Sequence, residues 1–126
     1  MESYLVDTNI LIRAIRGEPR YLNLLANLVA IGAVGCSVVT IAELCTGMRA
    51  HEQPRTDQLL ADLDHYDLTP ERARRAGRLK NEWFAKGFTF SLDDMFIAAT
   101  AIGENLMLVT TNTKDFPMPE LRLLRF

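Results

Sequence analysis

The chain has 126 residues, of which 48% are hydrophobic and 24% charged, and its formal net charge is -2. This length and composition are typical of one globular domain, so we expect residues 1–126 to form a single domain with one filled core. They exclude a low-complexity chain and a uniformly basic nucleic-acid-binding protein. Any nucleic acid must therefore meet a local basic patch or reach the protein through metal ions.

The predicted strands and helices alternate along the chain. Strands are expected at residues 4–6, 34–39, 66–68, 106–109 and 121–124. Helices are expected at residues 10–16, 21–31, 41–49, 54–65, 70–86 and 92–103. The strands are mostly continuous apolar runs, which is typical of a parallel sheet covered on both faces. The pattern predicts an α/β domain with a parallel sheet of about five strands.

The N-terminus, the longest apolar stretch and the cysteines together predict the cellular compartment of the protein. No signal peptide precedes the first strand, and the longest apolar-rich stretch, residues 22–31, is too short to span a bilayer. Cys36 and Cys45 lack the spacing of a metal site, and we expect both to be buried thiols. These features predict a cytoplasmic protein with no membrane partner.

Four acids follow or precede predicted strands in a way that could bring them together. Asp7 closes the first strand, and Glu43 lies four residues after Val39, which closes the second. Asp94 begins the helix before the fourth strand, and Asp115 follows that strand. Because parallel strands end at one edge of the sheet, the four carboxylates could converge there.

Each acid also has a purely structural interpretation. Residues 40–43 and 91–94 fit capping boxes, in which the acid bonds back to the start of its own helix. Asp7 could cap the following helix, and Asp115 could cap a turn before Pro117. Capping alone does not explain why all four positions cluster at one edge.

The chemistry of four gathered carboxylates favours a metal site. Like charges in one pocket repel one another, and a divalent cation removes that conflict. Oxygen ligands without His or Cys point to Mg²⁺ or Mn²⁺, and a phosphodiester is the natural substrate of such a site. No Ser or Cys nucleophile stands beside a histidine, and we expect His51 and His65 to lie on the surface.

Four segments resemble the motifs of the PIN-domain ribonucleases, in particular the VapC-type toxins of toxin–antitoxin pairs. They are residues 5–11, 40–44 with Gly47 beyond, 94–101 and 108–116. The third is the most specific; in it Asp93 precedes Asp94 and makes a double acid. The resemblance covers the whole chain. It implies an α/β/α sandwich, Mg²⁺- or Mn²⁺-dependent endonuclease activity on RNA, inhibition by a cognate antitoxin, and homodimers.

The resemblance also suggests a role for each site residue. Asp7 and Asp94 would bind the metal directly, and Glu43 would bind it or orient the attacking water. Asp115 would bind the ion or support the residues that do. Hydrogen bonds that fix the carboxylates are expected from four polar side chains: Thr8, Asn9, Thr110 and Asn112.

Three other functions compete with the ribonuclease interpretation. One is a non-catalytic PIN-like RNA-binding module, which would be favoured by a missing acid. Another is a receiver or dehalogenase-like phosphoryl-transfer domain, but the dehalogenase type needs an acid where Asn9 stands, and Lys114 suits the receiver type poorly. The third is an interaction protein whose acids are all caps, which metal titration would reject.

Two surfaces are candidate partner sites. The basic residues between Arg72 and Lys86 could contact an RNA backbone, or they could form a solvated face balanced by acids. Residues 10–15 and 22–31 carry more aliphatic side chains than one inner face requires. We expect them to form a groove for an antitoxin segment, whose arginine would enter the acidic pocket, or to serve a homodimer.

Overall fold

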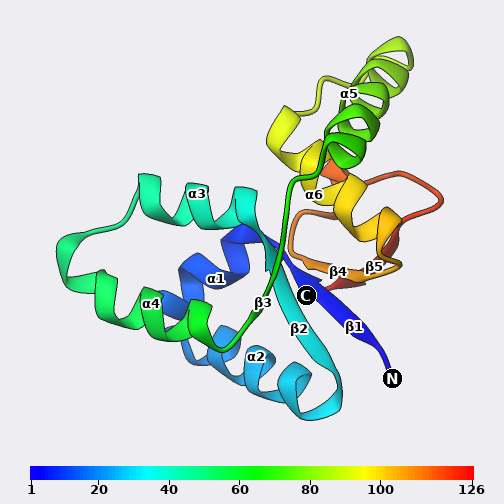
Figure 1. Cartoon of the computed structure of the whole chain (residues 1–126). Helices are drawn as coiled ribbons and strands as arrows, with labels where there is room; N and C mark the ends of the chain where they lie inside the picture. The colour runs from blue at the N-terminus through cyan, green and yellow to red at the C-terminus, as the bar shows by residue number, and fades with distance from the viewer.

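The fold is built on a five-stranded parallel sheet with the strand order β3-β2-β1-β4-β5. The computed structural model describes all residues from Met1 to Phe126. The strands are β1 (Ser3–Val6), β2 (Ala33–Ser37), β3 (Asp64–Tyr66), β4 (Met107–Thr110) and β5 (Arg122–Arg125). The first strand of the chain is thus the middle strand of the sheet, between β2 and β4 (Figure 1).

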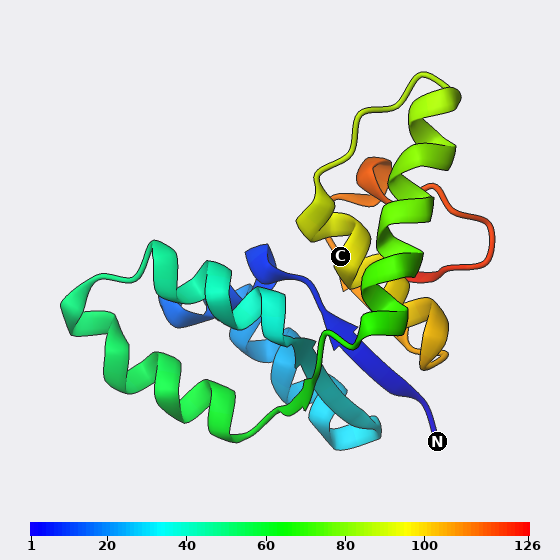
Figure 2. The same ribbon diagram turned by 45° about the horizontal axis from the view of Figure 1, so that its top comes forward.

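Helices cover both faces of this sheet, which confirms the expected α/β/α sandwich (Figures 1 and 2). One layer holds α1 (Thr8–Ile15), α2 (Pro19–Ile31), α3 (Val38–Thr46) and α4 (Gln53–Ala61). The other holds α5 (Pro70–Ala85) and α6 (Leu92–Gly103). Two short 3-10 helices, η1 (Ala50–Glu52) and η2 (Thr113–Asp115), lie in connecting segments.

Successive residues of β1 supply the two halves of the core. Leu5 packs into the cluster formed by α5 and α6, whereas Tyr4 and Val6 pack into the cluster formed by α1 and α2. In β4, Leu108 and Val109 divide between the same two clusters. Side chains on both faces of the sheet are buried, so these strands appear in the sequence as unbroken apolar runs.

The boundary between β2 and α3 differs from the prediction. The strand ends at Ser37 rather than at residue 39, and Val38 and Val39 begin the helix. The Ser37 side chain caps this helix by accepting a hydrogen bond from the Val39 amide at 3.1 Å. Two consecutive valines favour a strand, and this cap outweighs that preference.

Other boundaries shift by two to four residues. α1 begins at Thr8, α4 ends at Ala61 rather than at residue 65, and β3 lies two residues earlier than predicted. α5 begins as expected, with the Thr69 hydroxyl accepting from the Arg72 amide at 3.2 Å. Its C-cap is Lys86, and the next residue, Gly87, takes a φ of +94° that favours glycine.

Several expectations about the surface can also be compared with the structure. Cys36 is buried, but Cys45 is exposed, so the expectation of two buried thiols is wrong for the second. His51 and His65 are exposed as expected. No helix is both long and apolar enough to cross a membrane.

Candidate active site

Three adjacent strands bring the predicted acids to the carboxyl edge of the sheet. Asp7 directly follows β1, and its amide donates to the Val109 carbonyl of β4 at 3.0 Å. Glu43 lies in α3, which follows β2, and Asp115 ends η2, which follows β4. Asp94 lies in the first turn of α6. The sheet order therefore joins segments that are far apart in the sequence.

Both carboxylate oxygens of Asp7 are held by hydrogen bonds. Oδ1 accepts from the Thr8 amide at 2.8 Å, and Oδ2 accepts from the Thr110 hydroxyl at 2.8 Å. Thr110 is fully buried, and its hydroxyl oxygen in turn accepts from the Asn112 amide at 2.9 Å. Asp7 caps α1, as the structural interpretation of this residue expected, but the cap uses only one of its two oxygens. Burial is the main cause of a raised pKa at Asp7.

Glu43 is held by Thr8 of α1, which is itself bonded to Thr40 in the helix of Glu43. The Thr8 hydroxyl donates to Glu43 Oε1 at 2.7 Å and lies 3.0 Å from the Thr40 hydroxyl. Because Thr8 has one hydroxyl proton and the carboxylate can only accept, Thr40 must donate to Thr8. The capping-box interpretation of Glu43 is wrong, since the N-cap of α3 is Ser37. Thr40, which the sequence analysis missed, lies one helical turn before Glu43.

The electrostatics indicate that the four carboxylates share one environment. Burial, followed by the charge of Asp7 and the smaller effects of Asp115 and Glu43, raises the pKa of Asp94 to about 6. Burial and the charges of Asp93 and Asp7 raise the pKa of Glu43. The acids are therefore close enough to repel one another. Asp93, the exposed neighbour of Asp94, acts mainly on Glu43.

This donor set suits a hard divalent cation by its chemistry, since every side-chain ligand is an oxygen and no histidine or cysteine intrudes. The carboxylates are not, however, drawn in as tightly as the ligands of one ion, because no three of them meet the spacing of a metal site.

Two of the expected hydrogen-bonding residues do not contact the carboxylates. The side chain of Asn9 is exposed and makes no hydrogen bond to an acid. Asn112 contributes its backbone amide, which bonds to Thr110, and not its side chain. The threonines, Thr8 and Thr110, make all of the side-chain hydrogen bonds to Asp7 and Glu43.

A hollow adjoins the site between α1, α3 and α4. It is open to solvent, and Glu43 lies on its wall. Four apolar side chains line it: Ile12, Ile15, Leu44 and Met48. Of the aliphatic side chains expected to form a groove, Leu25 and Leu28 of α2 are buried in the core, whereas Ile12 and Ile15 of α1 line this hollow. The large apolar side chains of α2 that are exposed are Leu22, Val29 and Ile31.

Known proteins resemble this chain along nearly all of its length. The PIN domain family matches residues 4–118. "Ribonuclease VapC10" of Mycobacterium tuberculosis is 37% identical over 116 residues, which are 92% of this chain and 87% of that protein. "Ribonuclease VapC2" of Rickettsia felis is 34% identical and covers 90% of this chain and 89% of its own length.

A solved structure supports the same conclusion. The VapBC2 complex of Rickettsia felis, bound to a DNA fragment from its promoter, contains a chain that superposes with a TM-score of 0.88 at 31% identity. The superposition covers 98% of both chains. With the carboxylates at the end of the central strands and a family match over residues 4–118, the chain belongs to the PIN domain family.

Proposed function

We propose that this protein is a metal-dependent endoribonuclease that acts as the toxin of a toxin–antitoxin pair. The observation that carries the proposal is the convergence of Asp7, Glu43, Asp94 and Asp115 from four separate segments. The ribonuclease names of relatives at 34–37% identity support RNA as the substrate. The non-catalytic alternative would be favoured by a missing acid, and all four are present.

Mg²⁺ or Mn²⁺ is the cofactor that this site suits. Asp7 and Asp94 would hold it, with Glu43 and Asp115 binding it or the water around it. When bound, the ion supplies a nucleophilic water at neutral pH and neutralises charge on the phosphodiester. It would also relieve the repulsion that raises the pKa of Asp94.

The chain's own contribution is to orient these acids. Thr110 and the Thr8 amide fix both oxygens of Asp7, so that this carboxylate cannot rotate freely. The Thr8 hydroxyl fixes one oxygen of Glu43 and leaves the other available for a water or an ion. Carboxylates that are fixed in this way would hold a metal ion and its bound water in a defined orientation.

The adjacent pair of acids in α6 provides the test. Asp94→Asn should lose Mn²⁺-dependent cleavage of a labelled RNA by at least about 100-fold, as expected when a primary metal ligand is removed. Asp93→Asn, its matched control, should retain most of the activity because Asp93 is exposed. In calorimetric titration, Asp94→Asn should bind Mn²⁺ more weakly than Asp93→Asn does. Wild-type cleavage by Asp94→Asn, or cleavage by the parent in EDTA, would reject the proposal.

We also infer that a cognate antitoxin blocks this site. Solved structures that this chain resembles include toxin–antitoxin complexes, and four apolar side chains line the hollow beside Glu43. An antitoxin segment there could place an arginine against the carboxylates. Met48→Asp should weaken co-purification of the antitoxin, whereas Val29→Asp on the outer face of α2 should not. The opposite result would put the antitoxin on α2.

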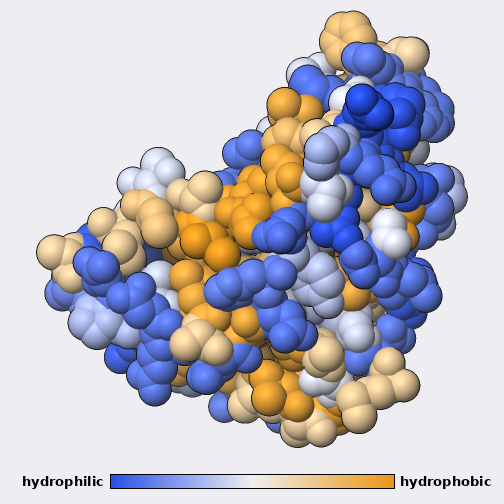
Figure 3. Space-filling model, in the orientation of Figure 1, coloured by the Kyte–Doolittle hydropathy of each residue, from blue (hydrophilic) through white to orange (hydrophobic).

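A second copy of the chain is the other expected protein partner. Phe84, Phe88 and Leu92 are large exposed apolar side chains at the end of α5 and the start of α6. Figure 3 shows apolar side chains gathered in the hollow between α3 and this half of the molecule. A patch of this kind is typical of an interaction surface, and we propose that it serves a homodimer.

A further inference from the structure

Arginines collect on one side of the molecule around the exposed face of α1. Five exposed arginines form what we call the arginine shelf: Arg13, Arg16, Arg20, Arg49 and Arg55. They come from α1, the start of α2, the segment before η1, and α4. The acids beside them are Glu18 and Glu52. The shelf is therefore locally positive in a chain whose net charge is -2.

The shelf is continuous with the active site. The hollow that contains Glu43 also contains Arg16. A second hollow joins Arg16 and Arg13 to Asn9 and Thr111, which flank the loops that carry the acids. A third runs from Arg16 outward to Arg49 and Arg55. Arg16 lines all three, so a surface path leads from the carboxylates onto the shelf.

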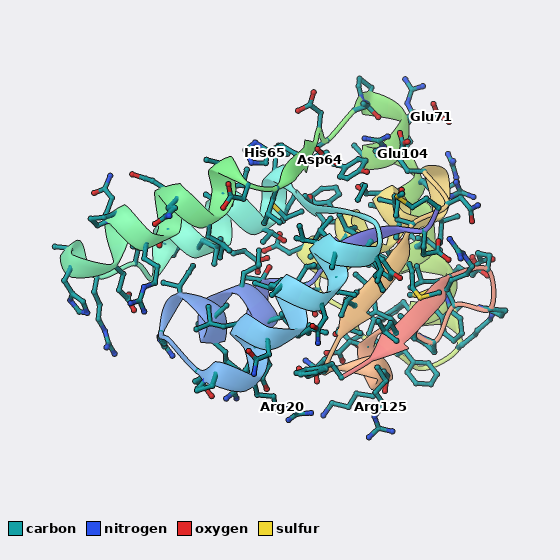
Figure 4. The ribbon with its side chains drawn as sticks, turned by 90° about the horizontal axis from the view of Figure 1, so that it is seen from below. Arg20, Asp64, His65, Glu71, Glu104 and Arg125 are labelled. Atoms are coloured by element: carbon teal, nitrogen blue, oxygen red, sulfur yellow. The ribbon has the colours of Figure 1, made fainter.

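Of the shelf arginines, Arg55 is bonded to the Ile15 carbonyl at 3.0 Å, whereas the guanidinium groups of the others keep exposed N–H edges. Arg20 stacks on the Phe126 ring at 4.2 Å and projects outward beside Arg125 (Figure 4). Stacking uses the face of the guanidinium and leaves its N–H edges free. Arg16 has only a loose ion pair with Glu52, at 3.9 Å, and the pair of Arg13 with Glu18 is exposed. Exposed ion pairs of this type are worth little and exchange readily.

The basic residues of α5 are in a different position. Arg72 bonds to Glu104 and to the Asp67 carbonyl, and Lys80 bonds to the Phe90 carbonyl. Lys86 pairs with Glu82. Arg72 and Lys80 are thus bonded within the protein and Lys86 has an exposed ion pair, whereas Arg74, Arg75 and Arg78 make no hydrogen bond or ion pair. The arginine shelf is the better candidate for a polyanion surface because its hollows reach Glu43, Asn9 and Thr111, whereas the hollows lined by Arg75 and Arg78 contain none of the four acids.

We propose that the arginine shelf binds the phosphate backbone of single-stranded RNA on one side of the cleavage point. This rests on the proposed ribonuclease function. A cluster of four carboxylates repels a polyanion, so the substrate needs cations next to the site, and Arg16 and Arg13 are reached directly from it. Arginine forks suit phosphate oxygens geometrically as well as by charge. The contacts are to the backbone and supply affinity, and they read no base sequence.

Binding without cleavage tests the shelf. We would measure fluorescence anisotropy of a labelled 20-nucleotide single-stranded RNA in EDTA over a series of salt concentrations. The Arg13→Gln/Arg16→Gln variant should bind more weakly, and its slope of log K against log salt should fall by roughly 0.7 for each lost contact. The matched control, Arg74→Gln/Arg78→Gln, removes the same charge from exposed positions of α5 and should leave the slope unchanged. Circular dichroism would verify that both variants fold.

Cleavage kinetics add a second readout. With Mn²⁺ present, the Arg13→Gln/Arg16→Gln variant should show a raised KM for this RNA and an unchanged kcat, since the carboxylates are intact. If the α5 control loses the same amount of salt slope, the weaker binding follows from the lower overall charge of the protein, and the proposal is overturned. Loss of antitoxin binding with an unchanged RNA slope would assign the shelf to protein and overturn it too. Cleavage by Asp94→Asn would instead reject the proposed ribonuclease site. The salt dependence of RNA binding would still test whether the arginine shelf contacts RNA, because it is measured without cleavage.

Discussion

The hydrogen bond between Thr110 and Asp7 should contribute measurably to stability. Thr110→Val keeps the shape of the side chain and removes its hydroxyl. The buried Oδ2 of Asp7 then loses its donor, and the Asn112 amide loses its acceptor. A hydrogen bond to a charged group is worth about 1.5 to 3 kcal/mol, and an unpaired buried group adds to the loss. We expect Thr110→Val to lower the free energy of unfolding by about 3 kcal/mol.

Urea denaturation in EDTA measures this loss. For an m-value of about 1.5 kcal/mol/M, a loss of about 3 kcal/mol lowers the midpoint by about 2 M. Thr100→Val is the matched control, because Thr100 is equally buried and its hydroxyl donates only to the Phe96 carbonyl within α6. It should cost no more than about 1 kcal/mol. If the two variants are equally stable, the Thr110 hydroxyl does not stabilise the Asp7 carboxylate and the reasoning fails.

Three further predictions concern the sheet, the apolar patch and the termini. In Gly35→Ala the new Cβ would lie 2.7 Å from a carbonyl oxygen of β3. Urea denaturation should therefore show that the free energy of unfolding falls by at least about 1 kcal/mol, and an unchanged midpoint would contradict this close packing. Phe84→Ser/Phe88→Ser should convert a dimer to a monomer in light scattering; a persistent dimer would move the interface elsewhere. The Arg122 guanidinium, bonded to Glu2 at 2.8 and 2.9 Å, lowers the pKa of that carboxyl. The pair therefore stabilises the fold above pH 4.5 and less as pH falls below it, and Glu2→Gln should reduce this acid sensitivity.

The fold could be predicted well because its signals are local. Buried parallel strands are continuous apolar runs, and Thr69 with Pro70 marks the start of α5 unambiguously. The end of β2 could not be predicted, because Val38 and Val39 favour a strand while Ser37 favours a helix start. The structure settles this conflict in favour of the helix, with the Ser37 hydroxyl capping α3.

In the candidate site, too, some features could be predicted from the sequence and others could not. The positions of the four acids relative to predicted strands were enough to expect their convergence, since parallel strands share an edge. The bond from Thr8 to Glu43 links residues 35 apart and depends on how α1 and α3 pack, which no local pattern encodes. The arginine shelf was missed for a related reason, because its members are scattered along the chain. The arginines of α5 are grouped in sequence, and the sequence therefore pointed to α5 as a candidate basic surface.

The central place of β1 has a consequence for the order in which the protein becomes active during synthesis. β1 leaves the ribosome first, but its neighbour β4 and the Thr110 that holds Asp7 follow 103 residues later. Bringing such distant segments together requires a large loop to close, which slows folding. At about 5 to 20 residues per second, the strands that hold Asp7 are separated by roughly 5 to 20 seconds of translation. An interrupted chain that lacks β4 has neither the Thr110 hydroxyl that holds Asp7 nor Asp115, so under the proposed function nuclease activity would arise only once the last quarter of the molecule has been made.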